Sequence, residues 1–251
     1  MECEPWEKSF SVTNADGSAG IALAQIGRKD FRLGSTIRYT GAKTGLEGKL
    51  SPTVLDDIRQ VTPAQLSVTD LASVPGPLRW FLNTYGVHTP AALVHDRLIG
   101  LDPPLPGMQD AYADRFFRFM LDDLGVPWMR RWMMWAAVAM RTRWDGSAIK
   151  RASLVVWLIA AIAGIVTLAI GAITGNWALV AASLVAPLVV CNLWGKQRGA
   201  GLVAAAAAPW LLPPLVLNVV GYGVYLAIEW VARRFRKRPE DEREPLRVGA
   251  D

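Results

Sequence analysis

Cysteine is scarce in this sequence, with two among 251 residues. Cys3 lies near the N-terminus and Cys191 lies inside an apolar stretch. Cysteines placed in this way form neither a disulfide framework nor the paired spacing of a zinc site. The first residues also lack the basic start and apolar run of a cleavable signal peptide. We therefore expect the N-terminal part of the chain to stay in the cytoplasm.

Several motifs of catalysis and nucleotide binding are missing as well. No Gly-x-Ser-x-Gly sequence occurs, so a hydrolase with a serine nucleophile of that type finds no support. The phosphate-binding loop and the dinucleotide fingerprint, both rich in glycine, are also missing.

Charge is scarce in one part of the chain only. Charged residues are spread through residues 1–151, nearly vanish up to residue 228, and return in a dense tail. The uncharged stretches 153–173 and 177–195 hold about 21 and about 19 residues, which is enough to cross a hydrocarbon core of ~30 Å. The sequence therefore predicts an integral membrane protein. Its parts are a soluble domain over 1–145, membrane-embedded helices over 152–232 and a charged tail over 233–251.

Basic residues gather on both sides of the apolar region. They are Arg130, Arg131, Arg141, Arg143, Lys150 and Arg151 before it, and Arg233, Arg234, Arg236, Lys237 and Arg238 after it. Such clusters mark cytoplasmic ends and suit anionic headgroups. Nucleic acid is the weaker alternative, because the nearby aromatics are tryptophans at membrane-interface positions. We expect a lipid bilayer as partner, with anionic phospholipid in it and no nucleic acid; a protein partner is not indicated.

The last apolar stretch, 200–231, allows two layouts. Pro209, Pro213 and Pro214 interrupt it near the middle. A re-entrant hairpin with its break at these prolines would keep every basic cluster in the cytoplasm. A single long tilted helix would give three spans and place the tail outside. We favour the hairpin.

The soluble part has the pattern of an α+β domain. Phe31–Leu33 and residues 36–40 alternate apolar and polar side chains and predict strands, and residues 55–60 could form a helical turn. Thr89 and Pro90 signal the start of a helix that ends at Gly100. Two more helices are expected over 110–124 and 127–144. The last of them either lies at the bilayer surface or is an ordinary core helix.

Three short motifs in the soluble part occur in a recognisable order. They are Thr-Asp-Leu-Ala-Ser-Val-Pro at 69–75, Ala-Ala-Leu-Val-His-Asp at 91–96 and Ala-Asp-Arg-Phe-Phe at 113–117. With the Gly-Val-Pro turn at 125–127, they resemble a small domain family of phages and prophages whose function is unassigned. The resemblance covers residues 31–144 and implies a phage or prophage protein in the inner membrane of a bacterial host.

The His-Asp pair also resembles the helix pair of secretory phospholipases and of the phospholipase domain of parvovirus capsids. This resemblance implies that His95 activates a water molecule, that Asp114 on the partner helix orients His95, and that Asp96 binds calcium. Asp70 is the further candidate for the catalytic cluster. A carboxylate that holds one ring nitrogen fixes the tautomer of a histidine base. The glycine-rich calcium loop of those enzymes has no counterpart here.

A structural interpretation of the same residues stays open. A histidine beside a carboxylate is often a satisfied polar pair, and Asp114 could favour the first turn of its helix through the helix dipole. If the site is catalytic, helices 91–99 and 110–124 should pack together and place His95 within hydrogen-bond reach of Asp114 or Asp70. Two functions follow: a phospholipase-like ester hydrolase at the membrane, or a non-enzymatic protein that anchors or remodels the membrane during phage infection or lysis.

Overall fold

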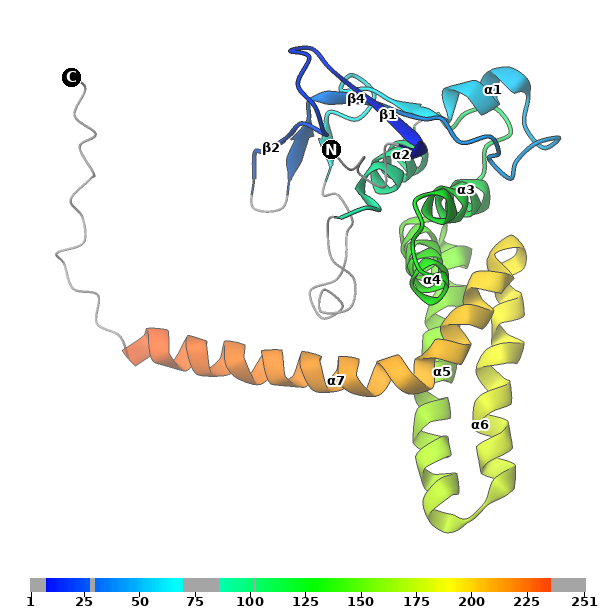
Figure 1. Cartoon of the computed structure of the whole chain (residues 1–251). Coiled ribbons are helices and arrows are strands. Elements are labelled where there is room, and N and C mark those ends of the chain that lie inside the picture. The colour runs from blue at the N-terminus through cyan, green and yellow to red at the C-terminus, as the bar shows by residue number, and fades with distance from the viewer. Residues whose placement is uncertain (1–7, 28–29, 70–85, 102, 236–251) are drawn as a thin grey trace. The chain divides into compact units, whose positions relative to one another are not determined.

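A computed structural model describes residues 8–27, 30–69, 86–101 and 103–235. The chain forms two compact units, Met1–Trp210 and Leu211–Asp251, and each is considered by itself. The first unit holds a strand-rich N-terminal region, a helical body, two complete apolar helices and the start of a third (Figure 1). The structure thus confirms the predicted α+β class.

The strands form two small antiparallel sheets. The first contains β1 (Phe10–Asn14), β4 (Ser35–Tyr39) and β5 (Gln60–Val61), in the order β1-β4-β5. The second contains β2 (Leu23–Gln25), β3 (Phe31–Leu33) and β6 (Val68–Thr69), in the order β2-β3-β6. Alternate residues of β4 are buried, as expected of a strand with one face on the core.

The predicted helical turn is α1 (Pro52–Asp57), which begins three residues before the expected position. The reason is local, because the Ser51 hydroxyl accepts a hydrogen bond from the Val54 amide and a proline occupies the first helical position.

The helical body contains α2 (Thr89–Ile99), α3 (Asp110–Asp123) and α4 (Trp128–Asp145). The predicted ranges agree with these within one or two residues. The start of α2 differs, because His88 occupies the cap position and the Thr89 hydroxyl accepts a hydrogen bond from the Gly86 amide. Gly125, with φ of 68°, ends α3 as predicted, and the Val126 amide closes the turn on the Leu121 carbonyl at 3.0 Å.

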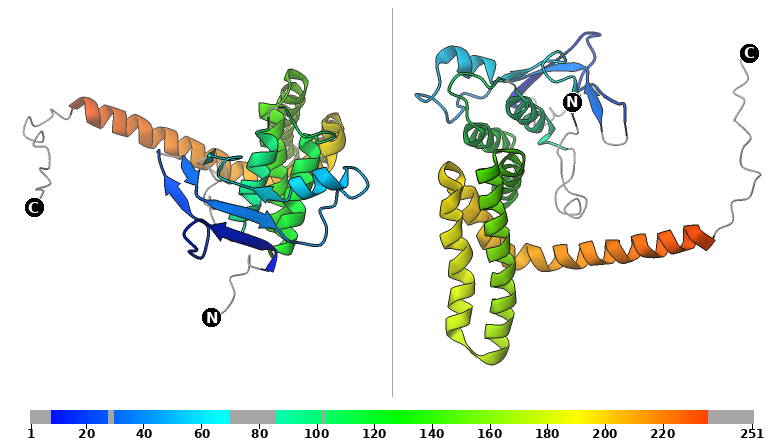
Figure 2. Two further views of the ribbon diagram at one scale, coloured as in Figure 1. Left: turned by 90° about the horizontal axis from the view of Figure 1, so that it is seen from above. Right: turned by 180° about the vertical axis from the view of Figure 1, so that it is seen from behind.

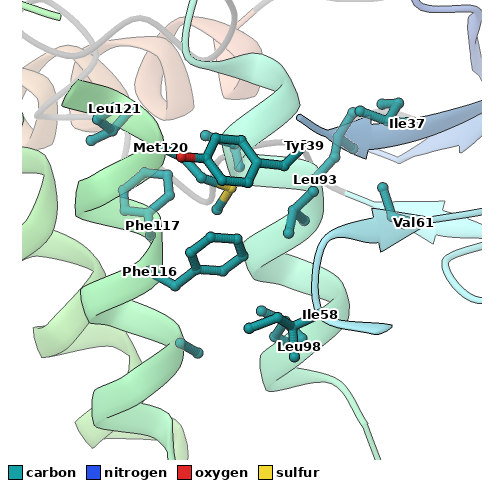
Figure 3. Packing of buried hydrophobic residues seen from close by; sticks show 14 of the residues in the cluster. Ile37, Tyr39, Ile58, Val61, Leu93, Leu98, Phe116, Phe117, Met120 and Leu121 are labelled. Carbon is teal, nitrogen blue, oxygen red and sulfur yellow. The ribbon is translucent and has the colours of Figure 1, made fainter. Parts of the chain in front are cut away.

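The hydrophobic core lies between the first sheet and helices α2 and α3 (Figure 3). Tyr39 of β4 contacts Phe10 and Phe116, with both ring-centroid distances at 5.3 Å. The apolar stripe of α3 points into this core, since Phe116, Phe117, Met120 and Leu121 are all buried. The core therefore holds α2 and α3 against each other at the place where the candidate site residues lie.

Three stretches are long and apolar enough to cross a membrane: Ala148–Thr174, Trp177–Leu211 and Pro213–Arg234. They belong to α5 (Ala148–Thr174), α6 (Trp177–Val190), the 3-10 helix η3 (Cys191–Gln197) and α7 (Arg198–Phe235). Figures 1 and 2 show α5 and α6 side by side. Gly164 permits their close approach, because a Cβ added there would lie 2.9 Å from the Ser183 carbonyl oxygen.

The expected break at the prolines is wrong, because α7 is helical throughout Arg198–Phe235. A membrane helix tolerates proline where neighbouring groups satisfy the freed carbonyls. The chain instead changes direction at Gly195, whose φ of 56° and ψ of −119° are not helical. Glycine suits this position, because other residues are strained at positive φ. The continuous helix agrees with the alternative layout of three spans; the sides of the membrane that the loops occupy stay a prediction.

Candidate functional site

Helices α2 and α3 bring His95 and Asp114 into direct contact. The distance between His95 Nε2 and Asp114 Oδ1 is 2.9 Å, which confirms the predicted hydrogen bond. Both residues are buried, with 4% of His95 and 0% of Asp114 exposed. The histidine ring also lies on Phe117, at a centroid distance of 5.1 Å. Helical spacing explains the pair, because the stripe that buries Phe117 also turns Asp114 inward.

Asp114 accepts hydrogen bonds from three different elements. Besides His95, its donors are the Thr142 hydroxyl of α4 at 2.9 Å and the Gln197 side-chain amide of η3 at 2.5 Å. A buried carboxylate is costly unless such donors surround it, and here they come from three directions. The side chain therefore has one fixed position.

The hydrogen bond determines which ring nitrogen of His95 carries a proton. A carboxylate only accepts, so Nε2 is the donor, and in the neutral ring Nδ1 is then the nitrogen that can take a proton. The pair has the arrangement of a general base with its orienting carboxylate. The catalytic roles of His95 and Asp114 stay predictions.

Arg143 extends the same network toward the apolar helices. Its guanidinium donates to the Gln197 side-chain oxygen at 2.9 Å, to the Trp194 and Leu193 carbonyls at 3.1 and 3.3 Å, and to the Ser153 hydroxyl. Burial lowers the pKa of Arg143, and the negative charge of Asp114 acts in the opposite direction. A buried cation is costly unless acceptors surround it, and these groups supply them. The same hydrogen bonds hold η3 against α4.

Sequence reasoning missed Thr142, Arg143 and Gln197 as members of the site. In the sequence, Arg143 counts among the basic residues that flank the apolar region, and Gln197 lies between Lys196 and Arg198. Gln197 lies 83 residues from Asp114 in the sequence. No local spacing could reveal that contact, although an uncharged polar residue next to a predicted span was a usable signal.

The two remaining candidates lie apart from this network or outside the described part. Asp96 accepts a hydrogen bond from the Thr69 hydroxyl of β6 at 2.8 Å. Asp70 lies outside the described residues. Within the residues that the structure does describe, no group of three or more His, Cys, Asp or Glu could hold a metal ion. Because calcium takes 6–8 oxygen ligands, these residues alone do not fit it, and the calcium role of Asp96 stays a prediction.

Comparison with known proteins gives one match. Residues 53–138, about a third of the chain, match the sequence model of a family described as "Protein of unknown function (DUF1353)". No match is found among the curated proteins or among the solved structures. The matched range contains His95, Asp96 and Asp114, whereas Thr142, Arg143 and Gln197 lie beyond it. The site therefore combines residues of the matched domain with the C-terminal part of α4 and with η3, which lies between the apolar helices α6 and α7.

Proposed function

We propose that this membrane protein is a hydrolase that cleaves ester bonds of lipids with His95 as general base. The observation that carries the proposal is the contact between His95 Nε2 and Asp114, whose carboxylate is fixed by Thr142 and Gln197. A lipid substrate fits a domain whose polar network continues into helices apolar enough to cross a membrane. The origin in a phage or prophage, and the bacterial inner membrane as location, remain parts of this proposal.

In the proposed reaction, His95 Nδ1 takes a proton from a water molecule as its oxygen attacks the ester carbonyl. The carbon–oxygen bond to the leaving alcohol then breaks, and the same proton passes from His95 to the alcohol. Asp114 keeps the proton of the resting ring on Nε2 and stabilises the imidazolium that forms in between. General-base catalysis of this kind contributes roughly 10²–10⁴-fold to the rate.

The chain offers a matched pair of variants to test this mechanism. His95→Asn keeps an amide donor for Asp114 but removes the base, and His88→Asn makes the same change at the chain's other histidine, which is also buried. The assay is fatty-acid release from phospholipid vesicles by the full chain in detergent micelles, with and without calcium. We expect His95→Asn to lower the rate by about 100-fold or more and His88→Asn to leave it unchanged.

Two results would contradict the hydrolase. One is activity in the wild type that His95→Asn does not reduce, and the other is a wild type without activity on any vesicle tested. Calcium dependence that is lost in Asp96→Asn would support the metal role of that residue.

A second function is favoured by a specific contact, the hydrogen bond from Gln197 of η3 to Asp114. In this alternative the buried network has no catalytic role and fastens the soluble domain to the membrane helices of a non-enzymatic anchoring or remodelling protein. His95→Asn would then lower the melting temperature of a protein that never hydrolyses lipid, and the two proposals are separated by the activity of the wild type alone.

A further inference from the structure

Arg118 of α3 lies on a floor of two tryptophans from α4. The central carbon of its guanidinium is 4.3 Å from the Trp132 ring centroid and 4.6 Å from the Trp135 ring centroid. The two indoles contact each other edge to face at 5.4 Å. Contact with two rings holds the guanidinium in one place, and among the described residues no hydrogen bond uses its N–H groups.

Positive charge is concentrated around this guanidinium. Burial is the largest cause that lowers the pKa of Arg118, and the charges of Arg115 and Arg131 lower it further. Arg131 has a counterion, because it forms an ion pair with Asp122. In the part of the chain that the structure describes, neither Arg115 nor Arg118 forms an ion pair with a carboxylate. Like charges held together in this way repel each other, and an anion bound between them would remove that cost.

The two tryptophans lie at the end of the apolar helices where charged residues begin. Trp135 is next to Gly199 at the start of α7, since a Cβ added to Gly199 would lie 3.1 Å from the indole ring. Trp128 and Met129 at the start of α4 are exposed by 66% and 64%, and Trp128 continues the aromatic row at 6.3 Å from Trp132. Exposed tryptophans beside basic residues are typical of the headgroup level of a bilayer.

We propose that Arg115 and Arg118, above Trp132 and Trp135, bind the phosphate group of an anionic phospholipid. The guanidinium of Arg118 matches the geometry of two phosphate oxygens, and Arg115 supplies the second positive charge one turn away on the same helix. Trp135 lies next to Gly199 at the start of the apolar helix α7, so a phosphate carrying acyl chains is favoured over free phosphate. This site uses none of the residues of the proposed reaction, so it does not depend on the hydrolase.

The test compares lipid binding by the full chain in detergent micelles, measured by native mass spectrometry during titration. The probes are phosphatidylglycerol, phosphatidylcholine and inorganic phosphate. The test variant is Arg115→Gln with Arg118→Gln. The control variant, Arg32→Gln with Arg38→Gln, removes the same charge at two arginines of strands β3 and β4, outside the basic clusters beside the apolar helices.

We expect the wild type to prefer phosphatidylglycerol, and the test variant to lose about tenfold or more in affinity for it, given the contribution of each basic residue near an anionic lipid. The control variant and His95→Asn should keep the preference, which separates this site from the reaction. Equal binding of both lipids by the wild type, or an unchanged preference in the test variant, would overturn the proposal. Saturation by inorganic phosphate at the same affinity would overturn its lipid part.

Discussion

The contact between Asp114 and Gln197 can be tested with a double-mutant cycle. Gln197→Ala removes the donor at 2.5 Å from Oδ2 of Asp114 and the acceptor that Arg143 uses at 2.9 Å. Asp114→Ala removes the shared acceptor of His95, Thr142 and Gln197. The double variant removes both side chains of the contact. The coupling energy is the difference between its loss in free energy of unfolding and the sum of the losses in the two single variants.

The size of the effect follows from burial and from the charge of the acceptor. A hydrogen bond to a charged group contributes about 1.5–3 kcal/mol, and a buried donor left without an acceptor costs about 1–3 kcal/mol. Gln197→Ala should therefore cost about 2–4 kcal/mol, since Arg143 keeps the Trp194 carbonyl as an acceptor. Asp114→Ala leaves three donors and should cost more, about 3–6 kcal/mol. Because one contact is counted in both single variants, we expect a coupling of about 1–3 kcal/mol.

The assay is urea unfolding of the full chain in a mild detergent, followed by tryptophan fluorescence. The signal comes from all 11 tryptophans of the chain and includes Trp194, whose ring lies 5.1 Å from the guanidinium of Arg143. Thr167→Val is the control, since its hydroxyl bonds only carbonyls of its own helix. A coupling below about 0.5 kcal/mol, the usual value for independent sites, would refute the idea that this contact joins the N-terminal domain to the apolar helices.

Two further predictions concern other parts of the fold. Gly164→Val should separate α5 from α6, because any Cβ at Gly164 meets the Ser183 backbone at 2.9 Å; a lower melting temperature than in Gly221→Val, where a Cβ meets nothing, would support this. For Tyr39, burial and the neighbouring Asp123 raise the pKa of the phenol, so its contribution to stability is complete below about pH 10 and falls as the pH rises further. Thermal unfolding between pH 8 and 11 should therefore show a steeper loss in the wild type than in Tyr39→Phe, and equal slopes would contradict the assignment.

Local patterns predicted the helices, and the resemblance to phospholipases pointed to His95 and Asp114, two of the five residues of the site. The spacing of Phe116, Phe117, Met120 and Leu121 at helical intervals defined α3 and its buried face, and that face carries Asp114 inward toward His95. Alternation likewise predicted the strands around Phe31 and Ile37. These helices and strands are determined by residues a few positions apart, so the local sequence pattern is enough to predict them.

The rest depends on contacts between distant segments. Gln197 reaches Asp114 because η3 lies against α4, and no local spacing near either residue predicts a contact across 83 residues. The helix over 198–235 was expected to break at its prolines, since proline lacks an amide donor. The chain turns instead at Gly195, where a positive φ is possible without strain. The second uncharged stretch ends at Gly195, so the sequence indicated the turn there, but it did not show that the next helix continues through the three prolines.

The division of the Asp114 contacts between two parts of the chain limits how freely the matched domain can be exchanged. A domain that satisfied its own polar groups could be fused to any membrane helix and keep its fold. Here a graft of residues 53–138 alone would leave behind Thr142 and Gln197, two of the three donors to a carboxylate that is fully buried. A working chimera would have to carry α4 and η3 as well, or replace Asp114 with a residue that needs no donors. In this chain, Gln197 of η3 therefore belongs to the buried polar network of the matched domain, although it lies outside the matched range.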